Sequence, residues 1–284
     1  RGLALTPVRF GISFTTSFLN QAGALIHIYK DGSVQLNHGG TEMGQGLYIK
    51  VAQVVSEVLG VDLEQVQITA TRTDKVPNTS ATAASSGSDL NGWAAKLAAL
   101  ELRDRLTAFW CGSQSIKGAL RFEGGEVLAD DGRRWPFTAV VKAAYLGRVS
   151  LSATGYYRTP KIDWDAKTGQ GRPFLYFAYG AAVSEVEIDT LTGANRVVRA
   201  DILHDVGRSL NPDIDHGQIE GGYVQGMGWL TMEELVYSAR GEVLTHAPST
   251  YKIPCASDRP DVLNIDLFEN ENTEDTIFKS KAVG

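Results

Sequence analysis

Two glycine-rich segments that each contain a glutamine are the first places in this sequence where a ligand could bind. The first segment, residues 38–46, reads HGGTEMGQG and places Met43, Gly44, Gln45 and Gly46 at the expected start of a helix. Glycine lets backbone N–H groups approach a ligand closely, and a helix N-terminus favours anionic groups. The Gln45 amide both donates and accepts hydrogen bonds, which suits the edge of a heterocycle. On the glycines alone, a tight turn that binds nothing is the preferred interpretation, because glycine-rich turns are common.

The second segment, residues 216–222, reads HGQIEGG and contains Gln218. It again places glycine and glutamine beside a helical pattern. Two such loops at equivalent places of a repeated unit could converge on one flat polar ligand. Two unrelated helix starts explain the residues equally well.

A run of small hydroxyl residues is the third candidate. Residues 79–88 read TSATAASSGS and include Thr82, Ala83, Ala84 and Ser85, directly before an expected helix. Small side chains at a helix start could hold a phosphate. A surface loop in which Ser88 or Asp89 caps the helix fits the composition as well.

Acid–base residues beside these segments do not form a complete catalytic set. His38 and His216 border the two glutamine segments, where orienting a loop is a better interpretation than proton transfer. Glu42 and Glu220 also border them, and neither is assigned as a general base without geometry.

Composition limits the classes of protein that the chain can belong to. Its 284 residues carry a formal net charge of -6, without a basic run or an apolar stretch of membrane-spanning length. We therefore expect no nucleic-acid or membrane partner and a cytoplasmic location. The two cysteines, Cys111 and Cys255, lie far apart, so we expect no disulfide framework, structural zinc or cysteine-ligated iron–sulfur cluster in the chain.

The elements that must position the candidate segments follow a plan that occurs twice. Residues 23–37 alternate around Asp31-Gly32 and predict a hairpin, followed by a helix over 47–59. Residues 182–207 predict a second hairpin that turns at Thr192-Gly193, and helical spacing follows within 209–228. The pattern predicts an α+β fold of two related two-layer lobes, in which β-hairpins and mixed sheet pack with helices.

The remaining patterns predict the bounds of these lobes and of a connector between them. We expect a first lobe over 1–107, a connector with a small hairpin and helix over 108–150, and a second lobe over 151–284. Residues 90–109 predict a helix with Leu97, Leu100 and Leu106 on one stripe, and residues 262–268 predict a strand.

Taken together and in order, five of these segments resemble the molybdenum-binding part of the xanthine dehydrogenase family. They are residues 11–46, 76–92, 209–228, 248–254 and 280–284. The resemblance implies that Phe14 and Thr15 form a substrate-pocket pair. It also implies contacts to the cofactor, with Ala83 and Ala84 close to the substrate as well; these residues are Met43, Gly44, Gln45, Gly46, Thr82, Ala83, Ala84, Ser85 and Gln218.

The resemblance further implies a reaction and a set of cofactors. Family members hydroxylate a substrate carbon with water-derived oxygen, and xanthine dehydrogenases convert hypoxanthine and xanthine to urate in purine catabolism. The cofactor would be molybdenum–molybdopterin, with or without an added nucleotide, whose metal is held by the pterin and not directly by this chain. The 2Fe-2S clusters, FAD and an earlier molybdenum lobe are expected on other domains or chains, in a dimer of multi-domain units.

The catalytic glutamate of the family lies in a KAVGEPP-type motif, of which this sequence shows Lys281 to Gly284. We therefore expect the base just beyond Gly284, a chain cut before it, and no turnover by the chain alone. An aldehyde oxidase or another N-heterocycle hydroxylase of the same superfamily is the alternative among enzymes. A non-catalytic cofactor-binding fragment is the alternative from another class.

Overall fold

The computed structural model describes residues 1–76 and 78–283. Pro77, within one of the resembling segments, and Gly284, the last residue of the KAVG motif, lie outside the described residues. The described residues divide into two units. The α2 unit, named after helix α2 (Gly87–Gln114), contains residues 11–76, 78–177 and 272–282; the α4 unit, named after helix α4 (Pro212–Thr231), contains residues 1–10, 178–271 and 283.

The α2 unit is built on a four-stranded sheet. In spatial order its strands are β4 (Val66–Ile68), β3 (Val34–His38), β2 (Gln21–Ile28) and β8 (Ser152–Arg158). Strands β2 and β3 form the predicted antiparallel hairpin, whose turn places Gly32 at a φ of 87°. Helix α1 (Leu47–Leu59) then crosses over to β4, which pairs parallel to β3. The predicted hairpin and the predicted bounds of this helix are confirmed.

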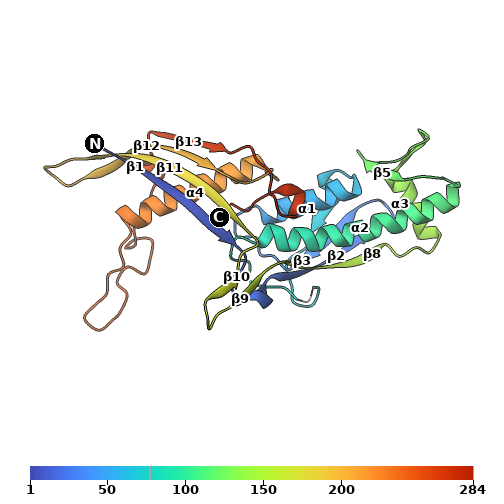
Figure 1. Ribbon diagram of the computed structural model, residues 1–284, viewed down its shortest axis with the longest axis horizontal. Coiled ribbons are helices and arrows are strands. Elements are labelled where there is room, and N and C mark those ends of the chain that lie inside the picture. The colour runs from blue at the N-terminus through green and yellow to red at the C-terminus, as the bar shows by residue number, and fades with distance from the viewer. Residues whose placement is uncertain (77, 284) are drawn as a thin grey trace. The chain divides into compact units, whose positions relative to one another are not determined.

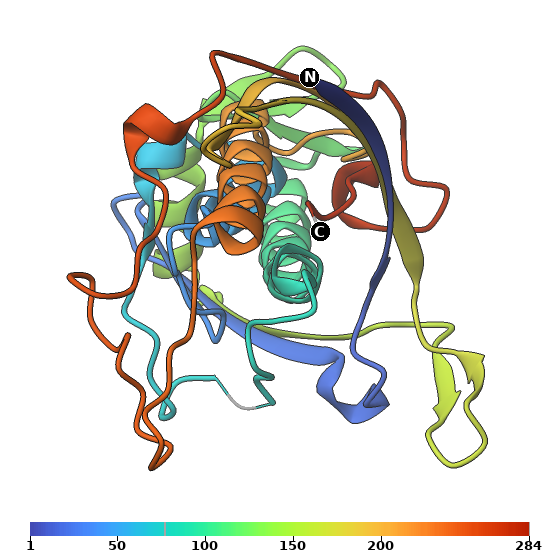
Figure 2. The same ribbon diagram turned by 90° about the vertical axis from the view of Figure 1, so that its left-hand side faces the viewer.

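Helices α1 and α2 cover one face of this sheet (Figure 1), and Figure 2 shows α2 nearly end-on above the strands. The face of α2 that meets the sheet is rich in alanine: Ala94, Ala95, Ala98 and Ala99 are fully buried. The predicted leucine stripe is therefore wrong in part, because Leu106 is buried but Leu97 is 37% exposed. Small side chains occupy the contact because the helix lies very close to the strands.

Gly155 in β8 shows how close this contact is. A Cβ atom at this position would lie 1.9 Å from the backbone oxygen of Ala94 and 2.8 Å from the backbone nitrogen of Ala98. Both atoms belong to the backbone of α2, which cannot move aside as a flexible side chain can. Glycine in the strand and alanine in the helix together allow the two backbones to approach.

The far end of the α2 unit contains the predicted connector. A three-stranded sheet is formed by β5 (Leu120–Glu123), β6 (Glu126–Ala129) and β7 (Arg134–Pro136), and α3 (Phe137–Leu146) follows. The small hairpin and helix expected here are confirmed. A second hairpin of β9 (Asp163–Asp165) and β10 (Gln170–Arg172) was not expected from the sequence.

The α4 unit repeats the plan of the first. In spatial order its strands are β13 (Val262–Leu267), β12 (Asn195–His204), β11 (Tyr176–Ile188) and β1 (Gly2–Ile12). Strands β11 and β12 form an antiparallel hairpin with Gly193 at a φ of 78°, and β13 pairs parallel to β12 after helix α4. Both units thus contain a hairpin, a helix and a strand parallel to the second hairpin strand. The predicted α+β fold with two related lobes is confirmed.

Each unit combines segments that are distant in sequence, while the expected bounds of the lobes and connector stay a prediction. Strand β1 precedes every element of the α2 unit in sequence but is paired with β11, and β8 lies after residue 150 but is paired with β2. Sheet pairing between distant segments therefore sets the boundaries of the units.

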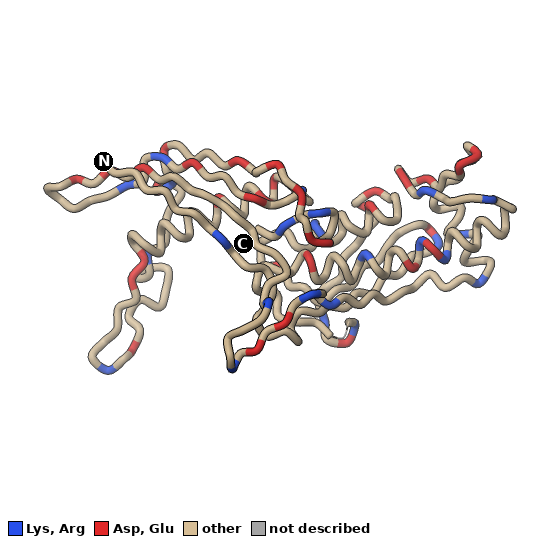
Figure 3. The backbone as a smooth tube through the Cα atoms, in the orientation of Figure 1, with Lys and Arg blue, Asp and Glu red and all other residues tan. Residues whose placement is uncertain are grey.

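Neither unit concentrates charge of one sign along its described backbone. Figure 3 shows acidic and basic residues interspersed along the backbone of each unit. Within residues 1–76 and 78–283, no helix has the length and apolar content needed to cross a bilayer.

The contact at Gly155 makes a testable prediction about stability. We expect Gly155→Ala to destabilise the protein by about 1–3 kcal/mol or more, because the added methyl group overlaps backbone atoms of α2. Urea denaturation followed by tryptophan fluorescence measures the change.

The same substitution at an uncrowded glycine of helix α2 provides the control. Gly112 in α2 is exposed, and a Cβ atom there would meet no atom within 4 Å. Gly112→Ala should therefore raise stability by up to about 1 kcal/mol through helix propensity. Equal effects of the two variants would show that the close contact of α2 with β8 does not exist.

Candidate functional site

Three loops of the α2 unit contain every predicted site residue except Gln218. We call them the Phe14 loop (residues 13–20), the glycine loop (residues 39–46) and the hydroxyl loop (residues 78–86). Each loop leads into or out of an element of the four-stranded sheet and its two helices.

Hydrogen bonds hold the three loops together. The backbone N–H of Thr41 in the glycine loop donates to Oγ1 of Thr82 in the hydroxyl loop at 2.9 Å. The Ser80 hydroxyl of the hydroxyl loop donates to the carbonyl of Leu19 in the Phe14 loop, and it lies 3.1 Å from the carbonyl of Gln21. The structure therefore gathers these predicted site residues into one region of the α2 unit.

Glu42 fixes the shape of the glycine loop. One carboxylate oxygen accepts hydrogen bonds from the backbone N–H groups of Gly44 and Gly46 at 2.8 and 3.0 Å, and the other accepts from Tyr48 at 3.0 Å. Burial alone would raise the pKa of Glu42, but these backbone hydrogen bonds outweigh it and lower the pKa. Glu42 is thus an ionised carboxylate that satisfies the first amides of α1, and its bonding gives it no role as a base.

Gln45 also supports the loop that carries it. Its side-chain oxygen accepts from the backbone N–H of Met43, and its amide nitrogen donates to the carbonyl of Thr41 at 2.8 Å. An amide oxygen can accept a second hydrogen bond and an amide nitrogen has a second proton. Gln45 therefore retains one acceptor and one donor position for a ligand, while the neighbouring Met43 is 66% exposed.

The glycines of this loop serve two different purposes. A Cβ atom on Gly39 would lie 1.9 Å from Oγ1 of Thr79, and one on Gly40 would lie 2.7 Å from Nδ2 of Asn91. These two glycines let the loops pack against each other and against α2. Gly44, by contrast, has a φ of 95° and open space around its Cβ position. The Gly44 side of the loop therefore leaves room for a ligand.

His38, buried at the end of β3, orients the start of the glycine loop. It is 3% exposed, its Nδ1 accepts from the backbone N–H of Gly40 at 3.1 Å, and its ring meets the edge of Tyr48 with centroids 5.2 Å apart. Burial lowers the pKa of His38 to about 4, so the imidazole is neutral at neutral pH. This geometry supports the loop-orienting role that the sequence favoured over proton transfer.

The hydroxyl loop turns sharply before α2. Ala84 and Ser85 have φ values of 55° and 50°, in the left-handed region where a side chain costs about 1–2 kcal/mol. Ser86 precedes the first helical residue, so Ser88 and Asp89 lie inside α2 and neither caps it as the sequence suggested. Such strained residues persist only where the surroundings fix them, and they often belong to binding sites.

Asn20 positions the backbone of Phe14. Its buried side chain accepts from the Phe14 N–H at 2.7 Å and donates to the Phe14 carbonyl at 2.9 Å. Phe14 is half-buried and the adjacent Thr15 is exposed. Neither Asn20 nor the bonding of Glu42 was identified from the sequence, although an acidic residue shortly before a helix is a known signal for its N-terminus.

Gln218 has a different setting from the one expected. It lies within helix α4 of the α4 unit and not in a glycine loop. Helix α4 begins early because Pro212 is its first residue and the Asn211 side chain caps it by accepting from the Ile214 N–H at 3.2 Å. The prediction that Gln45 and Gln218 face one ligand stays a prediction. The nearby Glu220 pairs with Arg259 at 2.9 Å.

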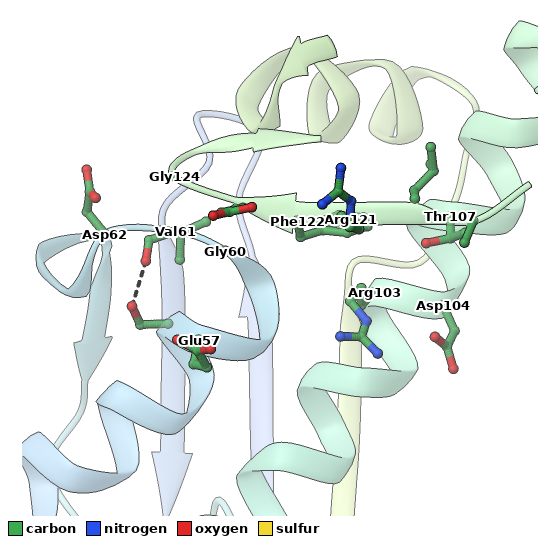
Figure 4. A pocket seen from close by; sticks show the side chains of 14 residues that line it. Glu57, Gly60, Val61, Asp62, Arg103, Asp104, Thr107, Arg121, Phe122 and Gly124 are labelled. Carbon is green, nitrogen blue, oxygen red and sulfur yellow. Dashed lines mark hydrogen bonds between the residues drawn. The ribbon is translucent and has the colours of Figure 1, made fainter. Parts of the chain in front are cut away.

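A cleft elsewhere in the α2 unit contains none of the predicted site residues. It lies at the C-terminal end of α1, between Gly60, Arg103 of α2 and Arg121 of β5 (Figure 4). The Ser56 hydroxyl donates to the Val61 carbonyl at 2.6 Å at its edge. Throughout the described parts of both units, no three His, Cys, Asp or Glu side chains form a group that could hold a metal ion.

Comparisons with known proteins identify the family to which the chain belongs. The family model described as the molybdopterin cofactor-binding domain matches residues 1–260. The chain is 49% identical over 284 residues to the xanthine dehydrogenase/oxidase of Felis catus, and it spans only 20% of that protein's length.

Solved structures show the same fold. Quinoline 2-oxidoreductase from Pseudomonas putida 86 matches the whole chain and 36% of its own with a TM-score of 0.80 and 27% identity. CO dehydrogenase from Oligotropha carboxidovorans matches the whole chain and 35% of its own with a TM-score of 0.82 and 22% identity, which speaks for the fold alone. The resemblance stated from the sequence is confirmed: the chain belongs to the molybdopterin cofactor-binding domain family.

Proposed function

We propose that this chain supplies cofactor and substrate contacts to a molybdenum hydroxylase of the xanthine dehydrogenase type, which oxidises hypoxanthine and xanthine to urate. The proposal rests on one observation: hydrogen bonds join the Phe14, glycine and hydroxyl loops in a chain that is 49% identical to a xanthine dehydrogenase/oxidase. The base beyond Gly284, the 2Fe-2S clusters, the FAD and the dimer belong to the same proposal, as does a cytoplasmic location.

The glycine and hydroxyl loops fit a pterin. Gly44 leaves open space, Gln45 retains one donor and one acceptor, and Thr82 accepts from Thr41 and so keeps its own hydroxyl proton for donation. When bound, the molybdenum–pterin cofactor supplies the two-electron redox chemistry of the oxidation.

The residues of this chain bind and orient the substrate and cofactor. Gln45 and Thr82 would donate to and accept from the polar edge of the pterin, and Ala83 and Ala84 would leave room beside it. Phe14, held by Asn20, would place its ring against the flat face of a purine, an arrangement that aromatic rings favour. Thr15 would lie beside it.

A second candidate function is the hydroxylation of another N-heterocycle or of an aldehyde. It is favoured by the structural match to quinoline 2-oxidoreductase at 27% identity. The loops described above do not distinguish a purine from another planar ring.

The test uses the purified full-length enzyme that contains this chain. We expect molybdenum and pterin in equal amounts, and urate formation from hypoxanthine and xanthine much faster than oxidation of quinoline or an aromatic aldehyde. The chain alone should form no urate. Preference for quinoline or the aldehyde would replace the proposal by the second candidate, and absence of pterin from the full enzyme would refute both.

Removal of the Gln45 side chain should weaken cofactor binding. Gln45→Ala leaves the Met43 N–H and the Thr41 carbonyl without partners and removes the contact to the pterin. Losing two or three such bonds costs about 2 kcal/mol, or roughly 30-fold in affinity. We expect less than stoichiometric pterin in the purified enzyme. Gln67→Ala, which removes an exposed glutamine of β4, should leave the pterin content unchanged.

Removal of the Phe14 ring should impair substrate use more than cofactor binding. We expect Phe14→Ala to lower kcat/KM for xanthine about tenfold, equivalent to about 1.4 kcal/mol, because ring stacking is lost. Phe18→Ala, in the same loop but 70% exposed, is the matched control and should retain kcat/KM. Steady-state kinetics of both variants at equal molybdenum content decide the outcome.

A further inference from the structure

A buried network of hydrogen bonds joins three parts of the α2 unit that are distant in sequence. The Tyr176 hydroxyl donates to Oδ2 of Asp89 at 2.6 Å and accepts from the backbone N–H of Ala282 at 2.9 Å. Asp89 and Tyr176 are 7% and 6% exposed. None of the loop contacts described above requires this hydrogen-bond network, so its purpose needs a separate explanation.

The roles of donor and acceptor in this hydrogen-bond network are fixed. Burial raises the pKa of Asp89 to about 6 although the Tyr176 hydrogen bond opposes the rise, so the carboxylate is mostly ionised at neutral pH. Burial likewise raises the pKa of Tyr176, so the phenol keeps its proton. The proton of Tyr176 therefore points to Asp89, and its lone pair is left for the Ala282 amide.

Residues 272–282 form a folded segment that ends at this hydrogen-bond network. The Ser280 carbonyl accepts from Nδ2 of Asn272 at 3.0 Å and from the Thr276 hydroxyl at 2.6 Å. Ile277 is fully buried, and a Cβ atom on Gly92 of α2 would lie 3.2 Å from its Cγ1 atom. The segment is thus seated on the beginning of α2, and Ala282 is held at its end.

The same helical turn carries the hydroxyl loop. Asp89 is the third residue of α2, directly after the loop that contains Ala83 and Ala84. Through Tyr176 this one turn therefore holds both the loop proposed to face the substrate and the backbone of Ala282.

We infer that Tyr176, oriented by Asp89, is a positioning residue that fixes the backbone of Ala282 relative to the start of α2 and the hydroxyl loop, and thereby the point from which the segment with the proposed catalytic glutamate continues. The inference rests on the proposed function in so far as the base follows Gly284. The fixed position of Ala282 itself does not depend on that function.

The test is Tyr176→Phe in the full-length enzyme, which removes one oxygen and keeps the ring in its contacts with Ile12 and Leu175. We expect amide hydrogen exchange in the peptide around Ala282 to become at least about tenfold faster, because its acceptor is lost. We also expect kcat for xanthine to fall about tenfold or more, while KM and pterin content stay unchanged, because only the placement of the base is disturbed.

Two further variants separate positioning from general structure. Tyr145→Phe changes a tyrosine of α3 that is 57% exposed and should keep both kcat and exchange at Ala282. Asp89→Asn keeps an acceptor for Tyr176 and should retain most activity, whereas Asp89→Ala should resemble Tyr176→Phe. The double variant Tyr176→Phe with Asp89→Ala should be no worse than either change alone.

Unchanged kcat and unchanged exchange in Tyr176→Phe would overturn the inference. A fall in kcat accompanied by an equal loss of pterin would also overturn it, because the residue would then only support the fold. If the parent enzyme forms no urate, the proposed function fails, and the exchange measurement still decides whether Tyr176 fixes Ala282.

Discussion

Helix α2 can lie where it does only because almost no side chain separates it from strand β8. Gly155 leaves no room for a Cβ atom, and the alanines of α2 bring the helix backbone onto the strand. This contact sets the height of the helix above the sheet and so places its first turn. That turn follows the hydroxyl loop, contains Asp89 and receives Ile277. The hydroxyl loop, Asp89 and Ile277 thus all depend on one close approach of two backbones.

The local elements were largely predictable from the sequence because their signals are local. Asp31-Gly32 and Thr192-Gly193 favour tight turns, and the valines of 47–59 have helical spacing that ends at Gly60, which indeed adopts a φ of 63°. The leucine stripe of α2 failed because hydrophobicity alone does not reveal that a helix packs closely and therefore buries alanine. Strand β1 was not foreseen, since its partner β11 lies far along the chain.

The candidate site was predictable in its loops but not in its bonding. The residue types in 38–46 and 79–88 indicated loops at helix starts, and in the structure a hydrogen bond joins these two loops. Sequence spacing could not show that the side chains of Glu42 and Gln45 form hydrogen bonds with the backbone of their own loop. It also misplaced Gln218, because a helix that contains several glycines looks like a loop until its proline and asparagine start signals are weighed. The contact between Asp89, Tyr176 and Ala282 joins residues that are distant in sequence and left no local signal.

The carboxylate of Glu42 has a consequence for the way in which a cofactor meets this surface. The partial positive charge at the start of α1 is already neutralised from within, so a phosphate gains little by approaching those amides. Hydrogen bonds of Glu42 and Gln45 already order the loop without a ligand, so less conformational entropy would be lost when one binds. On the proposed function, selectivity at this place would therefore derive from the shape and hydrogen-bond pattern of an uncharged ring system, and the cofactor would bind to a loop that is already folded.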